Sequence, residues 1–107
     1  MGGFKEVTDE TFDDMILKAD KPVLLEFMSS TCRSCKAIAG RLEELAEEFQ
    51  GQVEFLQLSI TDNMRWEDYD IRNTPTLLYF VSGEEVERQD FFPSKEEIKE
   101  ELNKLTS

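Results

Sequence analysis

The feature that most constrains this chain is a pair of cysteines placed where an apolar run gives way to a long helical pattern. Cys32 and Cys35 are the only cysteines, and two residues separate them. They follow the apolar run from Val23 to Met28, and apolar side chains then recur at helical spacing toward Phe49. This spacing lets two sulfur atoms meet across the first turn of a helix. The sequence therefore predicts a strand that leads through the cysteines into a helix.

The predicted position of Cys32 favours its ionised form. The first N–H groups of a helix have no intrahelical partners, and the helix dipole favours negative charge there. Arg33 and Lys36 act in the same direction, because they place positive charge near the sulfur. In Cys-x-x-Cys sites the cysteine pKa falls from about 8.5 to roughly 3.5–7.5. We therefore predict that Cys32 is a nucleophile and Cys35 the thiol that resolves its adducts.

Three other interpretations of the cysteine pair compete with redox chemistry. Inert buried cysteines rarely fall together at a strand-to-helix junction, and a disulfide across so short a loop constrains little of the unfolded chain. A zinc site needs about four ligands. The chain has no histidine and no third cysteine, so zinc would need carboxylates or a second subunit. The motif near a β-α-β pattern favours thiol–disulfide exchange, and we expect neither a metal nor a bound cofactor.

Length and charge narrow the class of protein. The 107 residues suit a single domain, residues 1–107. The formal net charge of −12 argues against binding to nucleic acid or to anionic membranes. No apolar stretch could span a bilayer, and no apolar signal core follows the N-terminus. We expect a cytoplasmic monomer; a secreted form whose signal was removed before residue 1 is the alternative.

Hydrophobic periodicity predicts the order of the elements. Strand patterns cover residues 4–7, 23–28, 53–60, 76–81 and 85–90. Helical patterns follow the capping candidates Thr8 and Asp9, run from Cys32 toward Phe49, and begin at Ser94, with a short helix expected within 61–70. Strand–helix–strand crossovers join parallel strands, whereas a tight turn joins antiparallel ones. The predicted fold class is α/β, with a mixed central sheet of four to five strands and helices on both faces.

Three ordered segments give the chain a resemblance to a known family. They are Pro22–Phe27, Cys32–Lys36 and Ile71–Phe80, and the turn Ser82-Gly83-Glu84 also fits. On these segments the chain resembles the thioredoxin family over nearly its whole length. The resemblance implies the thioredoxin fold and a thiol–disulfide oxidoreductase that acts on disulfide-containing proteins and receives electrons from a separate reductase. It also implies that Pro75 is cis beside the dithiol and that Thr74 offers its backbone to an extended substrate segment.

Glu26 is the one charged residue in the apolar run, and it matches the family position of a buried aspartate that relays protons to the resolving cysteine. An ionised carboxylate is costly to bury, so its pKa should rise. A carboxylate tuned in this way can act as general base for Cys35. The alternative is that the Glu26 side chain reaches the sheet edge and solvent.

The chain departs from the family pattern around the dithiol. Thr31 stands in place of a tryptophan, Arg33-Ser34 in place of Gly-Pro, Gln57 in place of a lysine, and Phe91 in place of a glycine that lines the substrate groove. We expect the loss of the proline between the cysteines and the gain of Arg33 to make the couple more oxidising than a typical thioredoxin, because both favour the thiolate. The altered groove residues also support an alternative function, a binding module that holds a partner protein with little turnover. The predicted substrate contacts are Thr31, Arg33, Thr74, Pro75 and Phe91.

Overall fold

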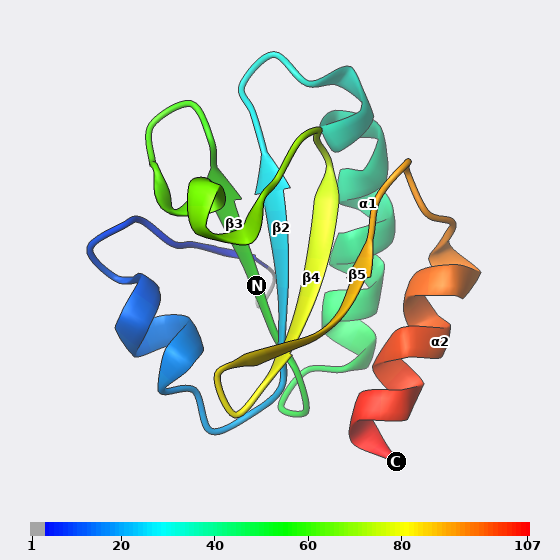
Figure 1. The fold of residues 1–107 in the computed structure, drawn as a ribbon. Coiled ribbons are helices and arrows are strands. Elements are labelled where there is room, and N and C mark those ends of the chain that lie inside the picture. Colours follow the sequence, from blue (N-terminus) through cyan, green and yellow to red (C-terminus); the bar gives the residue numbers. More distant parts are fainter. Residues whose placement is uncertain (1–3) are drawn as a thin grey trace.

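The fold is a five-stranded mixed sheet with helices on both faces (Figure 1), seen in a computed structural model that describes residues 4–107. The predicted domain also takes in residues 1–3, which lie outside this range. Strand order is β1-β3-β2-β4-β5, with β3 parallel to β1 and β2, and β4 antiparallel to β2 and β5. The strands are β1 (Lys5–Glu6), β2 (Val23–Met28), β3 (Glu54–Ser59), β4 (Thr76–Val81) and β5 (Glu84–Gln89). The helices are η1 (Asp13–Leu17), α1 (Arg33–Glu48), η2 (Arg65–Tyr69) and α2 (Lys95–Thr106).

The central strand β2 is buried on both faces, as its apolar sequence predicts. Leu24 packs in the cluster that includes the inner faces of α1 and α2. Val23, Leu25 and Phe27 point to the other face and pack with residues of η1 and β3. Successive side chains of a strand alternate between faces, and a strand covered on both sides needs apolar residues at every position. Glu26 therefore lies on the α1 side of the sheet, beside Leu24.

The long helix α1 begins where the cysteine pair predicts. Cys32 is its N-cap, and the Cys32 Sγ accepts a hydrogen bond of 3.0 Å from the Cys35 N–H. The predicted apolar face is confirmed, because its members are buried, whereas the glutamates between them are exposed. The buried members are Ile38, Leu42, Leu45, Ala46 and Phe49.

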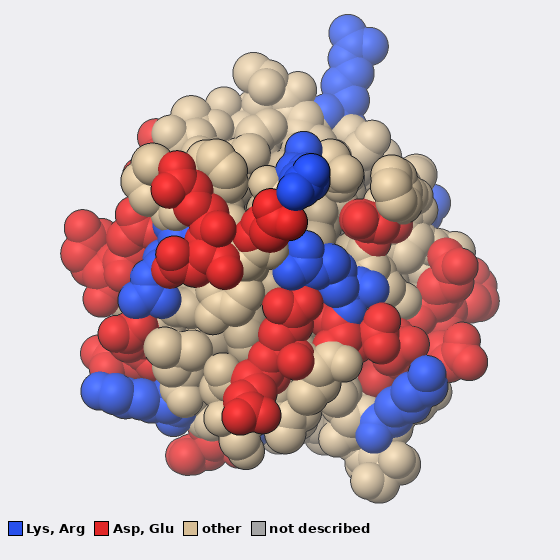
Figure 2. Space-filling view, viewed as in Figure 1, with Lys and Arg blue, Asp and Glu red and all other residues tan. Residues whose placement is uncertain are grey.

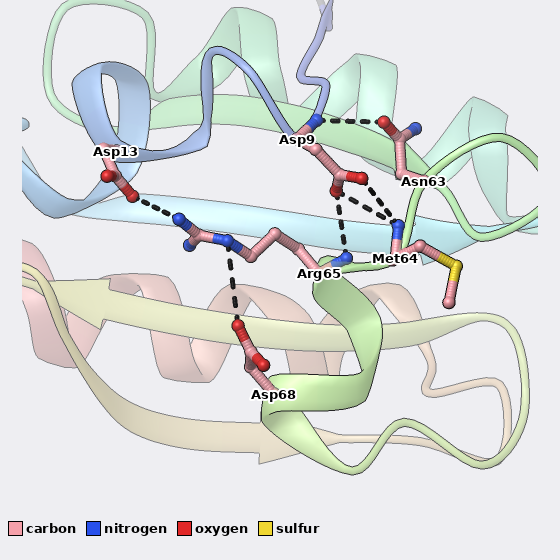
Figure 3. A network of polar contacts seen from close by, with 6 residues as sticks. All are labelled: Asp9, Asp13, Asn63, Met64, Arg65 and Asp68. Carbon is pink, nitrogen blue, oxygen red and sulfur yellow. Dashed lines mark hydrogen bonds and ion pairs between the residues drawn. The ribbon is translucent and has the colours of Figure 1, made fainter.

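The predicted cap of the first helix was wrong. Neither Thr8 nor Asp9 caps η1, a single π-helical turn that starts beyond Phe12. The Asp9 carboxylate instead accepts hydrogen bonds from the backbone N–H groups of Met64 and Arg65, at 2.8 and 2.9 Å (Figure 3). It thus supplies acceptors to the start of η2, more than fifty residues away in the chain. A carboxylate suits that position because unpaired N–H groups gather at helix starts.

The hairpin and the last helix follow their local sequence signals. Gly83 has a φ of +82°, and a Cβ there would lie 2.6 Å from the Leu17 carbonyl oxygen, so the turn requires glycine. Ser94 and Glu97 form the predicted capping box at the start of α2. The helix then buries Ile98 and Leu102 against the sheet.

Strand directions bring three chain segments to one end of the molecule. The register pairs Phe27 with Thr76 and Leu77 with Gln89, so the carboxyl ends of β2 and β5 lie beside the amino end of β4. Residues 29–32, 74–75 and 90–92 therefore emerge from the same edge of the sheet, at the top of Figure 1. Sites in open α/β sheets are found at the carboxyl ends of the central strands.

Candidate active site

The two cysteines form a disulfide at the start of α1. The Cys32–Cys35 bond joins residues whose Cα atoms are 5.3 Å apart, within the usual range for a disulfide. Cys32 is half-buried and Cys35 is only 5% exposed. The two sulfur atoms can therefore join and separate within one turn of chain, and an incoming molecule meets Cys32 first.

Cys32 lies at a helix start, and two positively charged residues follow it closely in the sequence. Its Sγ already accepts the Cys35 N–H at the helix start, and the helix dipole favours negative charge there. Arg33 and Lys36 are exposed, and neither makes an ion pair among the described residues. Figure 2 shows acidic side chains spread over the left, middle and right of the visible face, with few at its top. The helix start, Arg33 and Lys36 are the groups on which the predicted thiolate at Cys32 depends.

Glu26 is enclosed beneath the dithiol end of β2. Its side chain is 1% exposed, so the alternative in which it reaches solvent is wrong. Oε1 accepts a hydrogen bond of 3.3 Å from Gln57 Nε2 on β3, and Oε2 has no hydrogen-bond partner within residues 4–107. Burial raises the pKa of Glu26 from 4.5 to about 7, while the Gln57 hydrogen bond opposes the rise. The carboxyl group can therefore gain and lose a proton near neutral pH.

A pocket connects the dithiol to the partner of the buried acid. Its volume is about 140 Å³, and both Cys35 and Gln57 line it. Gln57 is in turn the hydrogen-bond donor to Glu26. From the sequence, Gln57 was identified only as a departure from a family pattern. The structure shows that the parallel pairing of β2 with β3 sets it directly beside Glu26. The remaining lining residues are Met28, Ser29, Ser30, Lys36 and Ala39.

The predicted substrate contacts emerge at the same end but differ in exposure. Thr31 and Arg33 are exposed, Thr74 is half-buried and Pro75 is buried. The Thr74–Pro75 peptide bond is cis, as the resemblance implied. Phe91 is 83% exposed and has a φ of 59°, so its ring stands in solvent.

The described part of the chain offers neither a candidate metal-binding group nor a candidate membrane-spanning helix. Across residues 4–107, histidine, cysteine and acidic side chains form no group of three that could hold a metal ion. None of the helices in that range has both the length and the hydropathy needed to cross a membrane.

Comparison with known proteins agrees with the geometry. The thioredoxin family model matches residues 3–104. Thioredoxin C-2 of Corynebacterium nephridii is 44% identical over 86 residues, 77% of this chain and 77% of that protein. A thioredoxin of Pseudomonas aeruginosa is 40% identical over 78 residues, 72% of each chain. A thioredoxin of Rickettsia felis is 31% identical over 99 residues, 92% of this chain and 94% of the relative. The chain therefore belongs to the thioredoxin family and is a thiol–disulfide oxidoreductase.

Proposed function

We propose that Cys32 attacks disulfides in protein substrates and that Cys35 completes the exchange. The Cys32 thiolate forms a bond to one substrate sulfur, the substrate S–S bond breaks, and the second substrate sulfur leaves as a thiolate that takes up a proton. Cys35 then attacks Cys32 Sγ, which forms the Cys32–Cys35 disulfide and releases the first substrate sulfur. Two electrons pass to the substrate. The observation that carries these roles is the difference in exposure, since Cys32 is half-buried and Cys35 is 5% exposed.

Glu26 takes the role of general base for Cys35 in this proposal. Cys35 must lose its proton before it attacks, and a base is most effective when its pKa is near the working pH. The pKa of Glu26, raised to about 7 by burial, meets this condition. Gln57 contacts Glu26 and also lines the pocket beside Cys35, so one side chain touches both the proposed base and the pocket of the resolving cysteine.

We further infer that Thr31, Arg33, Thr74, Pro75 and Phe91 contact the substrate. An extended substrate segment would lie along the Thr74 backbone, where main-chain hydrogen bonds give affinity. Electrons would come from a separate reductase. A cytoplasmic setting suits a cysteine pair that must return to the reduced state, and the net charge of −12 supports a monomer through self-repulsion.

Substitution of Cys35 by serine tests the assignment of the two cysteines. Cys35→Ser should lose turnover in insulin reduction with dithiothreitol. When the variant is reduced, freed of dithiothreitol and then mixed with substrate, it should accumulate a mixed disulfide between Cys32 and the substrate. Cys32→Ser is the matched control and should form no adduct. Mass spectrometry of the trapped species identifies the bonded cysteine. An adduct that persists in Cys32→Ser, or full turnover in Cys35→Ser, would contradict the assignment.

A further inference from the structure

The loop between β5 and α2 holds two successive phenylalanines in a backbone conformation that bulky residues rarely adopt. The φ angles are 59° at Phe91 and 62° at Phe92. The left-handed region is disfavoured for residues that carry a Cβ. Such strain persists only where the surrounding structure holds it, and it concentrates at functional sites. The contacts around this loop therefore need an explanation.

The two ends of the loop are fixed by contacts that do not reach the phenylalanines. Before the loop, Gln89 accepts a hydrogen bond of 2.6 Å from the Tyr79 hydroxyl and donates one of 3.0 Å to the Glu97 carbonyl. After the loop, Ser94 and Glu97 cap α2. These bonds position Gln89 and Ser94, but they do not fix the backbone of the residues between them. Another group must hold those residues.

Arg41 of α1 is that group. Its Nη1 donates a hydrogen bond of 2.7 Å to the Pro93 carbonyl, and its Cζ lies 4.3 Å from the centroid of the Phe92 ring. Both contacts are favourable, since the guanidinium stacks on aromatic faces while it donates in its own plane. Arg41 makes no ion pair within residues 4–107, although Glu44 of the same helix pairs with Lys95. Within the described residues, the polar and cation–π contacts of the Arg41 guanidinium are therefore those with this loop.

With the loop held by Arg41, the ring of Phe91 faces solvent at the dithiol end of the molecule. Phe92 lies under Arg41 and is 37% exposed, whereas Phe91 is 83% exposed, more than any other large apolar side chain among the described residues. The held loop keeps this ring at the dithiol end before a substrate arrives, and burial of the ring by an apolar partner is favourable.

We propose that Arg41 is a positioning residue that sets substrate preference. By holding the loop, it places Phe91 against an apolar side chain that lies beside the disulfide of the substrate protein. This inference rests on the proposed role of Phe91 as a substrate contact, and it adds both the residue that holds Phe91 and the chemistry that Phe91 selects.

Two disulfide-bonded peptides that differ only in leucine or serine next to the cysteine test the proposal. kcat and KM are measured for each with dithiothreitol as reductant, and a small aromatic disulfide reports the reactivity of the dithiol itself. The wild type should favour the leucine peptide about fivefold or more in kcat/KM, mainly through KM. Arg41→Met and Phe91→Gly should each reduce this preference to less than about twofold. Arg41→Met should do so without a change in the rate with the small disulfide.

Two further comparisons separate this role from a structural one. Phe91→Gly should raise Tm as it lowers the preference, because glycine adopts a positive φ without strain. Lys95→Met removes a positive charge beside the same helix and should keep the wild-type preference. A preference that survives in Arg41→Met, or an equal loss of rate with the small disulfide, would overturn the proposal. If the wild type turns over both peptides without preference, the proposal for Arg41 is wrong but the proposed exchange reaction stands. If it turns over neither peptide, the proposed exchange reaction is wrong as well.

Discussion

Replacement of Glu26 by glutamine should make the protein more stable at alkaline pH and leave it nearly unchanged at acidic pH. The folded state binds the Glu26 proton more tightly than the unfolded state, since burial raises the pKa from 4.5 to about 7. Below pH 4.5 the carboxyl is protonated in both states and the shift has no effect. As pH rises from 4.5 toward 7, the unfolded state loses its proton first, so the free energy of unfolding falls.

The size of this effect follows from the pKa shift. One pKa unit corresponds to about 1.4 kcal/mol, so the full shift destabilises the ionised protein by about 3 kcal/mol. Because the side chain is 1% exposed, solvent screens little of this energy. Glutamine keeps the shape and stays neutral, and its side-chain oxygen can accept the Gln57 hydrogen bond. The gain of Glu26→Gln over wild type should therefore grow by about 2.5 kcal/mol between pH 5 and pH 8.

Urea denaturation of the oxidised protein at pH 5, 6, 7 and 8 measures this gain. The oxidised form is chosen because disulfide-bonded cysteines do not titrate. Glu54→Gln is a matched control on the neighbouring strand, where the carboxylate is partly exposed and pairs with Lys21; its effect should not grow with pH in the same way. A gain for Glu26→Gln that is the same at pH 5 and pH 8 would refute the argument, because it would show that Glu26 does not titrate in this window.

Two other substitutions test single contacts of the structure. Gln57→Leu removes the hydrogen bond that lowers the pKa of Glu26, so the pKa of Glu26 should rise above about 7. NMR titration of the Glu26 carboxyl carbon measures this pKa. An unchanged pKa would show that Gln57 does not influence Glu26. Asp9→Ala leaves the N–H groups of Met64 and Arg65 without their acceptor and should lower the free energy of unfolding by about 2 kcal/mol, measured by urea denaturation. Asp9→Asn, which keeps one acceptor oxygen, should recover part of the loss, and a neutral Asp9→Ala would contradict the proposed link.

Much of the site could be predicted because its chemistry is local. Cys32 and Cys35 are neighbours in sequence, and their place at a strand-to-helix junction follows from the periodicity on either side of them. The burial of Glu26 could also be predicted. Its neighbours in the strand are apolar at odd and even positions alike, so neither face of the strand is suited to solvent. The hydrogen-bond partner of Glu26 could not be predicted, because it depends on the register of β2 against β3, which is a property of the assembled sheet.

Contacts between distant segments could not be predicted in the same way. Asp9 precedes a helix and carries a good capping side chain, but the fold directs its carboxylate to η2 (Figure 3). Arg41 appears in the sequence as one more charged residue on the outer side of an amphipathic helix. Its contact with Pro93 spans 52 residues and depends on how α1 packs against the loop before α2.

The sequence by itself thus determined the order of strands and helices, the dithiol and the buried acid. Each of these depends on residues close together in the chain and on which face of a strand or helix is apolar. The tertiary structure alone decided that Gln57 and Cys35 share a pocket, that Asp9 supports η2, and that Arg41 holds the loop of Phe91. These choices depend on strand register and helix packing, which are fixed only when the whole core assembles.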